Sequence, residues 1–350
     1  MNVIFLCFTP YHIKVSNWLS KTKFREYKRY MILSSFTCIE EDKLRSFVEQ
    51  NLYNNIEYYH LNYKMNKVIK KPLLYIQKYR NDLNNFLKAV DKIEPEYIIY
   101  FSDNPIPYQI LFNKMEMKEK KLILVEEGTA LYLNKYKFSL KEKLSFYIRK
   151  KIFKDKTARL FQYGKGNYED IIILREPELI NSRAQKIKIT PEQYKQIFLT
   201  DKKGIDKFIS NGGALFCPTY TTYNINIRNK VYNDIFRHYF NAKKDLYIKL
   251  HPAERNINYV KELADKYGSY IKFIDDFSIT SEDIIIASEI DEVVSDFSSV
   301  LINAYYLKEN IKLISYMNLL KDKYNIKTNF SYSIYDKLYL EGRIEDFKFE

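Results

Sequence analysis

The chain has 350 residues, enough for two domains that each bury a core of their own. Hydrophobic residues make up 46% and charged residues 29%, the balance of a folded protein, and the 8 glycines and 9 prolines exclude collagen-like or linker-dominated architectures. The 57 Lys and Arg against 44 Asp and Glu give a net charge of +13, which makes membrane surfaces, nucleic acids and acidic substrates candidate partners.

Short β-branched and aromatic runs alternate with longer amphipathic segments, which predicts parallel α/β units. The predicted strands of the first half are Val3–Thr9, Tyr30–Ser34, Ile56–Leu61, Tyr97–Ser102 and Lys121–Glu126. A helix is predicted over Leu73–Val90, where apolar residues recur at helical spacing. Because the strands are nearly continuous in apolar character, we expect a sheet that is covered on both faces.

The same alternation continues in the second half. The predicted strands are Ala214–Pro218, Leu246–Leu250, Ile271–Ile274, Glu292–Ser295 and Ile311–Tyr316. The predicted helices are Arg228–Tyr239, Ile257–Tyr267, Ser281–Ser288 and Ser298–Leu307.

The pattern is interrupted across Thr190–Asn211, where a proline, two lysines and an Asn-Gly-Gly turn break it. We predict two Rossmann-like domains, residues 1–195 and 205–325, and a C-terminal segment, residues 326–350, able to pack back on the first domain. Ligands of open α/β sheets bind outside the carboxyl ends of the strands. Two such domains facing each other would place the site in the cleft between them.

Residues 135–156 stand apart in charge, with nine Lys or Arg and two acidic residues. The bases are interleaved with Phe138, Leu144, Phe146, Ile148, Ile152 and Phe153. This composition is typical of an amphipathic helix on an anionic membrane, which gains up to ~1 kcal/mol per base near the surface. The alternative is a domain helix with a solvated basic face.

The three cysteines, Cys7, Cys38 and Cys217, lie far apart without Cys-x-x-Cys spacing. This argues against a disulfide framework or a structural zinc site and favours a reducing compartment. The apolar run near the N-terminus is too short to span a bilayer and follows no basic stretch, and no other run approaches ~18 apolar residues. We therefore expect a cytoplasmic protein, at most attached to a membrane surface.

Nucleotide and metal motifs are absent from the sequence. No Gly-x-Gly-x-x-Gly follows the first strand, and there is no phosphate-binding loop with a lysine. Neither a His-Glu-x-x-His motif nor an Asp-x-Asp pair at a strand end occurs. We therefore expect chemistry without a metal ion or a bound cofactor.

Two adjacent carboxylates, Glu126 and Glu127, directly follow an apolar strand. They repel each other, and partial burial at a strand end raises the pKa of one toward the range of a general base. Gly128 permits a sharp turn after them. The alternative is a solvated loop or a helix N-cap.

Two more motifs end strands in the second half. His251, between Lys249 and Pro252 in the sequence, ends an apolar strand, which favours a side chain that faces a cleft. Ser298 and Ser299 precede an apolar helix, whose N–H groups and hydroxyls can cradle a phosphate. A core histidine and an ordinary N-cap are the structural alternatives. Together with the acids, these motifs predict an inverting transferase, with the acceptor on one domain and a nucleotide-activated donor on the other.

In this order, Glu126-Glu127 with its glycine, His251-Pro252 and Ser298-Ser299 resemble the acid-acid-Gly, His-Pro and Ser-Ser motifs of bacterial sialyltransferases. The family-52 enzymes of lipooligosaccharide and capsule synthesis and the bacterial polysialyltransferases are similar in size and opening. The resemblance implies an α/β GT-B fold. It also implies metal-independent, inverting transfer of sialic acid from CMP-sialic acid to a hydroxyl of a galactoside or sialoside in a surface glycan.

Carried over by position, the resemblance gives each motif a role. One carboxylate of Glu126 and Glu127, with Glu127 favoured, deprotonates the acceptor hydroxyl, and His251 contacts the donor phosphate and stabilises CMP as it leaves. The other expected donor contacts are Lys249, Pro252, Ser298, Ser299 and Thr219. The expected acceptor contacts are Thr9, Pro10 and His12, in a segment similar to the Thr-Pro turn after the first strand of these enzymes.

Two alternatives stay open. The first keeps the fold and changes the donor to another CMP-activated acidic sugar such as Kdo, or extends the reaction to processive polysialylation. The second is a basic protein that binds a membrane surface or nucleic acid without catalysis. Outside residues 135–156 the charge is spread over the chain and no nucleic-acid motif occurs, so we expect no specific nucleic-acid partner.

Overall fold

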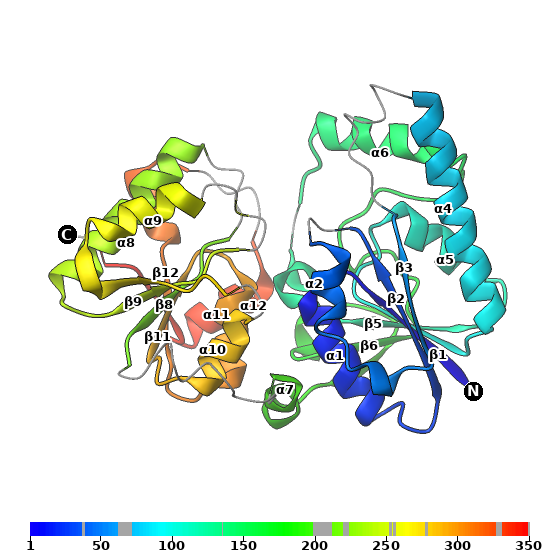
Figure 1. Cartoon of the computed structure of the whole chain (residues 1–350), viewed down its shortest axis with the longest axis horizontal. Coiled ribbons are helices and arrows are strands. Elements are labelled where there is room, and N and C mark those ends of the chain that lie inside the picture. The colour runs from blue at the N-terminus through cyan, green and yellow to red at the C-terminus, as the bar shows by residue number, and fades with distance from the viewer. Residues whose placement is uncertain are drawn as a thin grey trace. The chain divides into compact units, whose positions relative to one another are not determined.

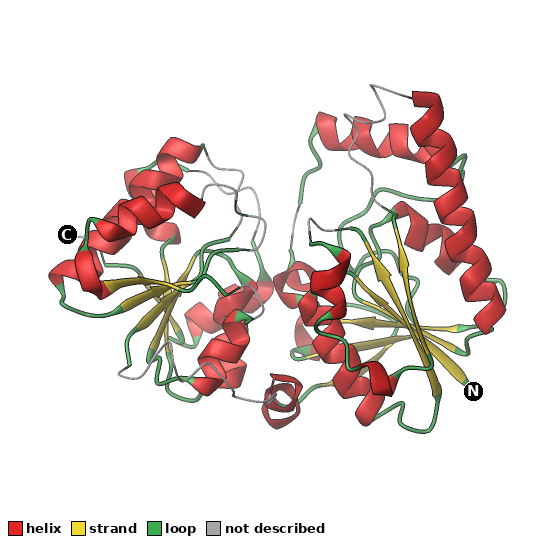
Figure 2. Cartoon of the chain, in the orientation of Figure 1, coloured by secondary structure: helices red, strands yellow, loops and turns green. Residues whose placement is uncertain are grey.

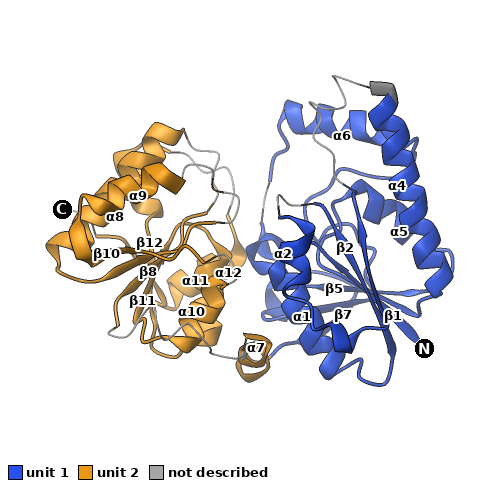
Figure 3. Ribbon diagram, in the orientation of Figure 1, with its two compact units in different colours: residues 1–189 blue, residues 190–350 orange. Residues whose placement is uncertain are grey.

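The computed structural model describes residues 1–36, 39–61, 72–134, 136–198, 212–219, 224–251, 254, 257–276, 279–326 and 331–348. The chain divides into two compact units, Met1–Ile189 (unit 1) and Thr190–Glu350 (unit 2), coloured separately in Figure 3. Within the described residues, no helix is long and apolar enough to cross a membrane.

Unit 1 contains one parallel sheet. Its described strands are β1 (Asn2–Cys7), β2 (Lys28–Ser34), β3 (Asn55–Tyr59), β4 (Tyr97–Tyr100), β5 (Lys121–Val125), β6 (Ile171–Leu174) and β7 (Gln185–Lys188). They lie in the order β3-β2-β1-β4-β5-β6-β7, which is the Rossmann order with one strand added at the β7 edge.

Helices cover both faces of this sheet. Those described are α1 (Pro10–Lys21), α2 (Glu41–Arg45), α4 (Pro72–Ile93), α5 (Ile106–Glu116) and α6 (Leu140–Ile152). Figure 1 shows α1 and α2 on one face and α4 and α5 on the other. The central strand β1 is therefore buried over Val3–Cys7, which explains its unbroken apolar run.

Unit 2 repeats the plan. Its described strands are β8 (Ala214–Phe216), β9 (Leu246–Ile248), β10 (Ile271–Phe273), β11 (Glu292–Ser295), β12 (Lys312–Ser315) and β13 (Ile344–Asp346), in the order β10-β9-β8-β11-β12-β13. The helices are α7 (Pro191–Phe198), α8 (Ile225–Asn241), α9 (Ile257–Asp265), α10 (Ser281–Ala287), α11 (Ser299–Leu307) and α12 (Ser333–Leu340). In Figure 2, α8 and α9 lie on one face of the sheet and α10 and α11 on the other. The predicted α/β fold with two Rossmann-like domains is confirmed.

Two segments differ from their predicted placement. Helix α7, which was not predicted and which spans the predicted domain boundary at residue 195, belongs to unit 2, where Tyr194 packs edge to face on Tyr306 of α11 with 6.1 Å between ring centroids. The C-terminal segment, expected to pack back on the first domain, completes the sheet of unit 2. Its strand β13 pairs parallel to β12, with Ile344 opposite Leu313.

The strand order locates the ligand-binding edge of each unit. The order reverses between β1 and β4 in unit 1, and between β8 and β11 in unit 2. At such a reversal the connecting segments leave toward opposite faces, and a crevice opens at the carboxyl ends of the two strands. The predicted motifs follow these strands or their neighbours β5 and β9.

Candidate active site

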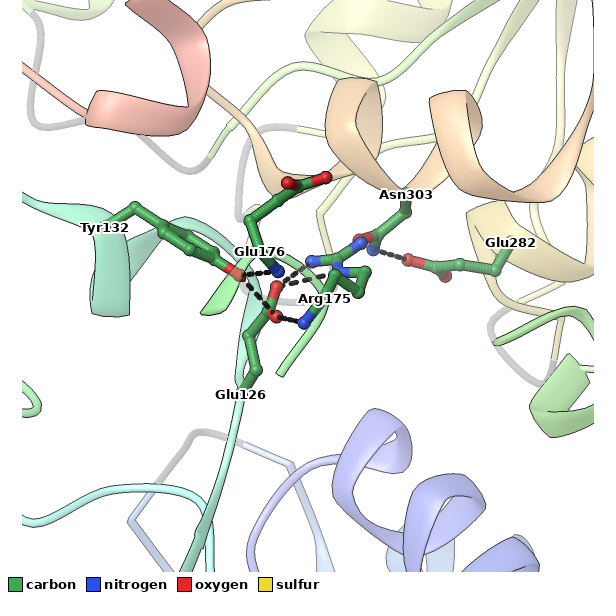
Figure 4. Close-up of polar contacts among 6 residues, drawn as sticks. All are labelled: Glu126, Tyr132, Arg175, Glu176, Glu282 and Asn303. Carbon is green, nitrogen blue, oxygen red and sulfur yellow. Dashed lines mark hydrogen bonds and ion pairs between the residues drawn. The ribbon is translucent and has the colours of Figure 1, made fainter. Parts of the chain in front are cut away.

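The two predicted carboxylates of unit 1 have different surroundings. Glu126 is buried at 1% exposure and forms an ion pair with Arg175, which follows β6 (Figure 4). Its Oε1 accepts from Arg175 Nε at 2.7 Å, and its Oε2 accepts from the Arg175 backbone N–H and from the Tyr132 hydroxyl, each at 2.7 Å. Both oxygens are therefore occupied, and the role of Glu126 is to hold the loop after β5.

Tyr132, in the 3₁₀ helix η2 (Gly128–Tyr132), completes this cluster. Burial, and after it the charge of Glu126, raise the pKa of the Tyr132 phenol well above its usual value, so the hydroxyl stays a donor. Its oxygen in turn accepts the backbone N–H of Glu176 at 3.1 Å. Neither Arg175 nor Tyr132 was predicted from the sequence, because neither belongs to a recognisable local motif.

Glu127 points the other way, with 29% of its side chain exposed. Gly128 follows with φ of +68°, a conformation that glycine adopts without strain, so the chain turns sharply after the two acids. Glu127 Oε1 lies 2.8 Å from Nε2 of His12. Of the two candidate bases, Glu127 alone has a carboxylate that reaches solvent.

His12 is fully buried at the start of α1, which differs from its predicted contact with the acceptor. Its ring stacks on Phe101 with 4.2 Å between centroids, and its Nδ1 accepts the backbone N–H of Phe8 at 3.3 Å. An acceptor at Nδ1 carries no proton, so the neutral ring has its N–H at Nε2, toward Glu127. Nε2 has no well-aligned hydrogen bond, and the 2.8 Å approach to Glu127 is the contact that orients it.

Thr9 and Pro10, also expected to contact the acceptor, begin helix α1. The Thr9 hydroxyl accepts the backbone N–H of His12 at 3.2 Å, and Pro10 is the first helical residue. Serving as an N-cap and a first-turn proline are structural roles typical of these residue types. The Thr-Pro segment therefore fixes the position of His12.

Glu127 lines a cavity of about 710 Å³ within unit 1. The ends of β1 and β4 contribute Phe8, Ser102 and Asn104 to its wall, and helix α6 contributes Lys141 and Arg149, among other residues. Part of the basic segment singled out in the sequence is thus a wall of this cavity. Glu142 of α6 also lines it, so the wall carries two carboxylates, two cations and aromatic surface, a lining that can hold a charged sugar.

In unit 2, the carboxyl ends of β8 and β11 are tied together. Asp296 follows β11 with 2% exposure and accepts a hydrogen bond from the hydroxyl of Thr219, which follows β8. Burial raises the pKa of Asp296 to about 6, so the carboxylate is ionised at neutral pH. Because its hydroxyl donates to Asp296, Thr219 can offer a ligand only its lone pairs.

The serine pair opens helix α11. The Ser298 hydroxyl accepts the backbone N–H of Val300 at 3.3 Å, and Ser299 is the first helical residue. The predicted N-cap is confirmed. Tyr335 of α12 donates to the Ser298 carbonyl at 2.5 Å, which ties α12 to this helix start.

The residues after β9 are placed separately. Lys249 is buried, and its Nζ donates to the backbone carbonyl of Asp276 at 2.5 Å; burial lowers the pKa of its amine. His251 reaches the surface, yet enough of the chain surrounds its ring to lower its pKa below 6.5, an effect that the charge of Glu254 partly offsets. Pro252 lies outside the described residues.

Among the described residues, no three His, Cys, Asp or Glu side chains gather closely enough to hold a metal ion.

Two Rossmann-like units in one chain define the GT-B fold. The UDP-N-acetylglucosamine 2-epimerase of Rickettsia bellii has this fold with a TM-score of 0.56 at 13% identity, covering 90% of this chain and 79% of that one. The Methanocaldococcus jannaschii UDP-GlcNAc 2-epimerase, in complex with UDP-GlcNAc and UDP, scores 0.54 at 16% identity, with 90% and 84% covered. A UGT transferase from Siraitia grosvenorii in complex with UDP scores 0.53 at 7% identity, with 91% and 84% covered.

Residues 3–317 match the sequence model of the alpha-2,8-polysialyltransferase family, and the chain belongs to that family. None of the curated proteins compared with the chain matches it. The family makes the protein a sialyltransferase-type glycosyltransferase, which uses a nucleotide-sugar donor and a glycan acceptor. The predicted resemblance to polysialyltransferases is thereby confirmed, and the closer likeness to the family-52 enzymes stays a prediction.

The Glu126–Arg175 pair makes a stability prediction. In Arg175→Met, Glu126 keeps its burial and loses its counter-charge, so the free energy of unfolding should fall by ~3–5 kcal/mol, measured by urea denaturation. Glu127→Gln is the matched control at the neighbouring, partly exposed position and should change stability by less than ~1 kcal/mol. Equal losses in the two variants would contradict a structural role specific to Glu126.

Proposed function

We propose that this protein is an inverting, metal-independent sialyltransferase that moves sialic acid from CMP-sialic acid to a hydroxyl of a sialoside in a surface glycan. The observation that carries the proposal is Glu127, a solvent-reaching carboxylate in a cavity whose neighbouring acid is neutralised by Arg175. The family match supports the choice of sialic acid as the transferred group.

Glu127 serves as the general base in this proposal. It takes the proton of the acceptor hydroxyl while the hydroxyl oxygen bonds to the anomeric carbon of sialic acid and the bond from that carbon to the CMP oxygen breaks. The new bond forms on the face opposite the leaving group, so the configuration inverts. CMP is a stable leaving group, so orientation of the reactants and stabilisation of charge on its phosphate supply most of the rate.

His12 acts through Glu127 as a positioning residue. With its N–H at Nε2 and 2.8 Å from Glu127 Oε1, it holds that oxygen and leaves Oε2 for the acceptor. Lys141 and Arg149 in the cavity wall can pair with the carboxylate of a sialoside, whereas Glu142 of the same wall accepts hydrogen bonds from Ser139 and Tyr136. This is why a sialoside is preferred here to a neutral galactoside.

Unit 2 binds the donor in this proposal. The N–H groups at the start of α11 and the hydroxyls of Ser298 and Ser299 bind the phosphate, as an anion binds at a helix N-terminus. His251 contacts the same phosphate and gives its proton to the leaving CMP. We also keep Thr219, Lys249 and Pro252 as proposed donor contacts. Their support is their position in the sequence, since Thr219 follows β8 and the other two follow β9.

Turnover with CMP-sialic acid tests the proposal, and Glu127→Gln tests its base. With a sialoside acceptor and EDTA present, the wild-type protein should release CMP and form an extended product. The Glu127→Gln variant should lose at least ~10²-fold in kcat and bind CMP as tightly as wild type, because its amide cannot take the proton. CMP release is followed by chromatography and CMP affinity by calorimetry.

Each failure in this experiment has a separate meaning. Transfer from CMP-Kdo but not from CMP-sialic acid would replace the donor, and transfer abolished by EDTA would overturn metal independence. A tenfold loss of CMP affinity in Glu127→Gln would move Glu127 into donor binding. Repeated addition to one acceptor would identify a polymerase.

The lowered pKa of His251 sets a pH dependence. Because burial lowers the pKa of His251 from its usual value, the ring is neutral under mildly alkaline conditions and becomes protonated as the pH falls. If it donates the proton to CMP, kcat should rise as the pH decreases from 8 toward 6, and His251→Ala should lose this rise along with ~10²-fold or more of kcat. His238→Ala, also in unit 2, is the control that should keep the wild-type profile. A wild-type profile in His251→Ala would remove His251 from the mechanism.

We also propose that helix α6 binds an anionic membrane surface. On the side away from the cavity, Leu140, Leu144 and Tyr147 are exposed by 84%, 62% and 59% at helical spacing. Lysines flank this row, among them Lys143 and Lys151. Apolar side chains beside cations complement the interface of a bilayer that contains acidic lipids.

Vesicle sedimentation tests this membrane contact. The protein should sediment with phosphatidylglycerol-containing vesicles. The double substitution of Leu144 and Tyr147 by Glu should weaken binding by at least ~10-fold, because it removes apolar side chains that would enter the bilayer interface and adds negative charges that the anionic lipids repel. Leu340→Glu, at an even more exposed leucine of α12, should bind as wild type does. Equal binding to pure phosphatidylcholine, or no loss in the α6 variant, would contradict the proposal.

A further inference from the structure

Arg228, near the start of α8, is a buried arginine in which two of the three side-chain nitrogens have no hydrogen-bond partner. Its side chain is 9% exposed, and its Nη1 donates to Glu254 Oε2 at 2.6 Å in a buried ion pair. Its Nε and Nη2 are both buried and have no hydrogen-bond partner. Neither the sequence motifs nor the proposed mechanism gives this residue a function.

The two unpartnered nitrogens form one edge of the guanidinium group. The N–H of Nε and one N–H of Nη2 point in parallel, and this is the edge with which arginine binds a carboxylate or a phosphate through two hydrogen bonds. Glu254 occupies Nη1, outside that edge, and holds the group in place. The ring of Tyr232 lies 5.8 Å from the guanidinium carbon and limits its movement further.

Burying such an edge without an acceptor destabilises the protein, because each unmade hydrogen bond to a charged group costs desolvation energy that is not recovered. In proteins generally, most buried side-chain polar atoms have at least one hydrogen-bond partner. An oxyanion placed against Nε and Nη2 removes this cost. The arrangement is that of a preorganised anion site, fixed by Glu254 before the ligand arrives.

The position of Arg228 connects this edge to the donor residues of unit 2. Helix α8 follows the loop after β8, in which Thr219 lies. Glu254 follows β9, and its backbone N–H donates to the carbonyl of His251 at 2.9 Å. Arg228 therefore lies near the start of the helix that follows β8, and it contacts Glu254 in the segment that follows β9. Thr219 and His251 lie in these same two connections, at the ligand-binding edge of the sheet.

We propose that Arg228 binds an oxyanion of the donor, its phosphate or its carboxylate, through Nε and Nη2. This inference rests on the proposed function, because it takes the donor to be a CMP-activated acidic sugar. Arg228 is a donor-binding residue held by Glu254, and Glu254 is a positioning residue that touches no substrate.

Arg228→Lys is the test variant, because lysine keeps the positive charge beside Glu254 and lacks the two-nitrogen edge. We expect it to fold, with a melting temperature close to that of wild type, and to bind the donor at least ~10-fold more weakly. Arg237→Lys is the matched control and should bind as wild type does, because Arg237 lies on the same helix with its side chain 51% exposed and paired to Asp234 at 3.0 Å.

Two ligands separate the two oxyanions. CMP carries the phosphate alone, so a loss of CMP affinity in Arg228→Lys, measured by calorimetry, assigns the phosphate. Unchanged CMP affinity with a raised KM for CMP-sialic acid assigns the carboxylate. A variant with wild-type values for both ligands overturns the inference and leaves the proposed function intact.

Inorganic phosphate separates a failure of this inference from a failure of the proposed function. If the wild-type protein binds no CMP, the proposed donor is wrong, and protection by phosphate against thermal unfolding becomes the readout. Protection of wild type and of Arg237→Lys, but not of Arg228→Lys, would support an oxyanion site at Arg228. Equal protection of all three proteins, or of none, would overturn it.

Discussion

The buried ion pair between Glu126 and Arg175 determines what the end of β5 can do. Leaving that carboxylate buried without a partner would destabilise the fold, whereas here it pairs with the guanidinium of Arg175 and accepts further hydrogen bonds from the Arg175 backbone and the Tyr132 hydroxyl. Because Glu126 makes this pair, Glu127 is not needed to balance the charge of Arg175. Glu127 can then turn outward after β5 and meet His12 and the cavity, and the chemistry proposed for unit 1 depends on this division of roles between two identical side chains.

The shared strand order explains why polar groups gather where they do. In each unit the reversal leaves the ends of two central strands uncovered by connecting helices, so side chains there can be polar without being buried against apolar neighbours. Unit 1 uses this edge for a cavity with a carboxylate. Unit 2 uses it for the link between Thr219 and Asp296 and for the start of α11, so one topology supports two different chemical environments.

The sequence predicted the strands of both sheets where their apolar runs are long or well bounded, and β11 was predicted with its observed limits. It did not predict β6, a run of only four apolar residues between irregular segments, and consequently missed Arg175 at its end. Nor did it predict β13, whose three residues include two exposed acids and carry no periodicity. Such strands are fixed by pairing with a neighbour already in the sheet, which is information that a local pattern does not hold.

The sequence indicated which residues belong to the candidate site, but it did not indicate which side chains those residues contact. Acids at the end of β5 and serines at the start of α11 are visible in the sequence because strand ends and N-caps have local signals. Whether Glu126 or Glu127 points inward depends on the turn made at Gly128 and on a partner 49 residues away. The burial of His12 on α1 likewise depends on Phe101, which directly follows β4.

Helix α6 has one side in the wall of the cavity and another side open to solvent. A ligand in the cavity and a partner on the open side would contact the same helix, so that binding at one side can change the affinity at the other through α6. By thermodynamic linkage, if binding at one side changes the affinity at the other by some factor, then binding at the other side changes the first affinity by the same factor. Under the proposed function, the cavity side would meet the acceptor and the open side a membrane, so one helix would carry both contacts and each would be measurable through its effect on the other.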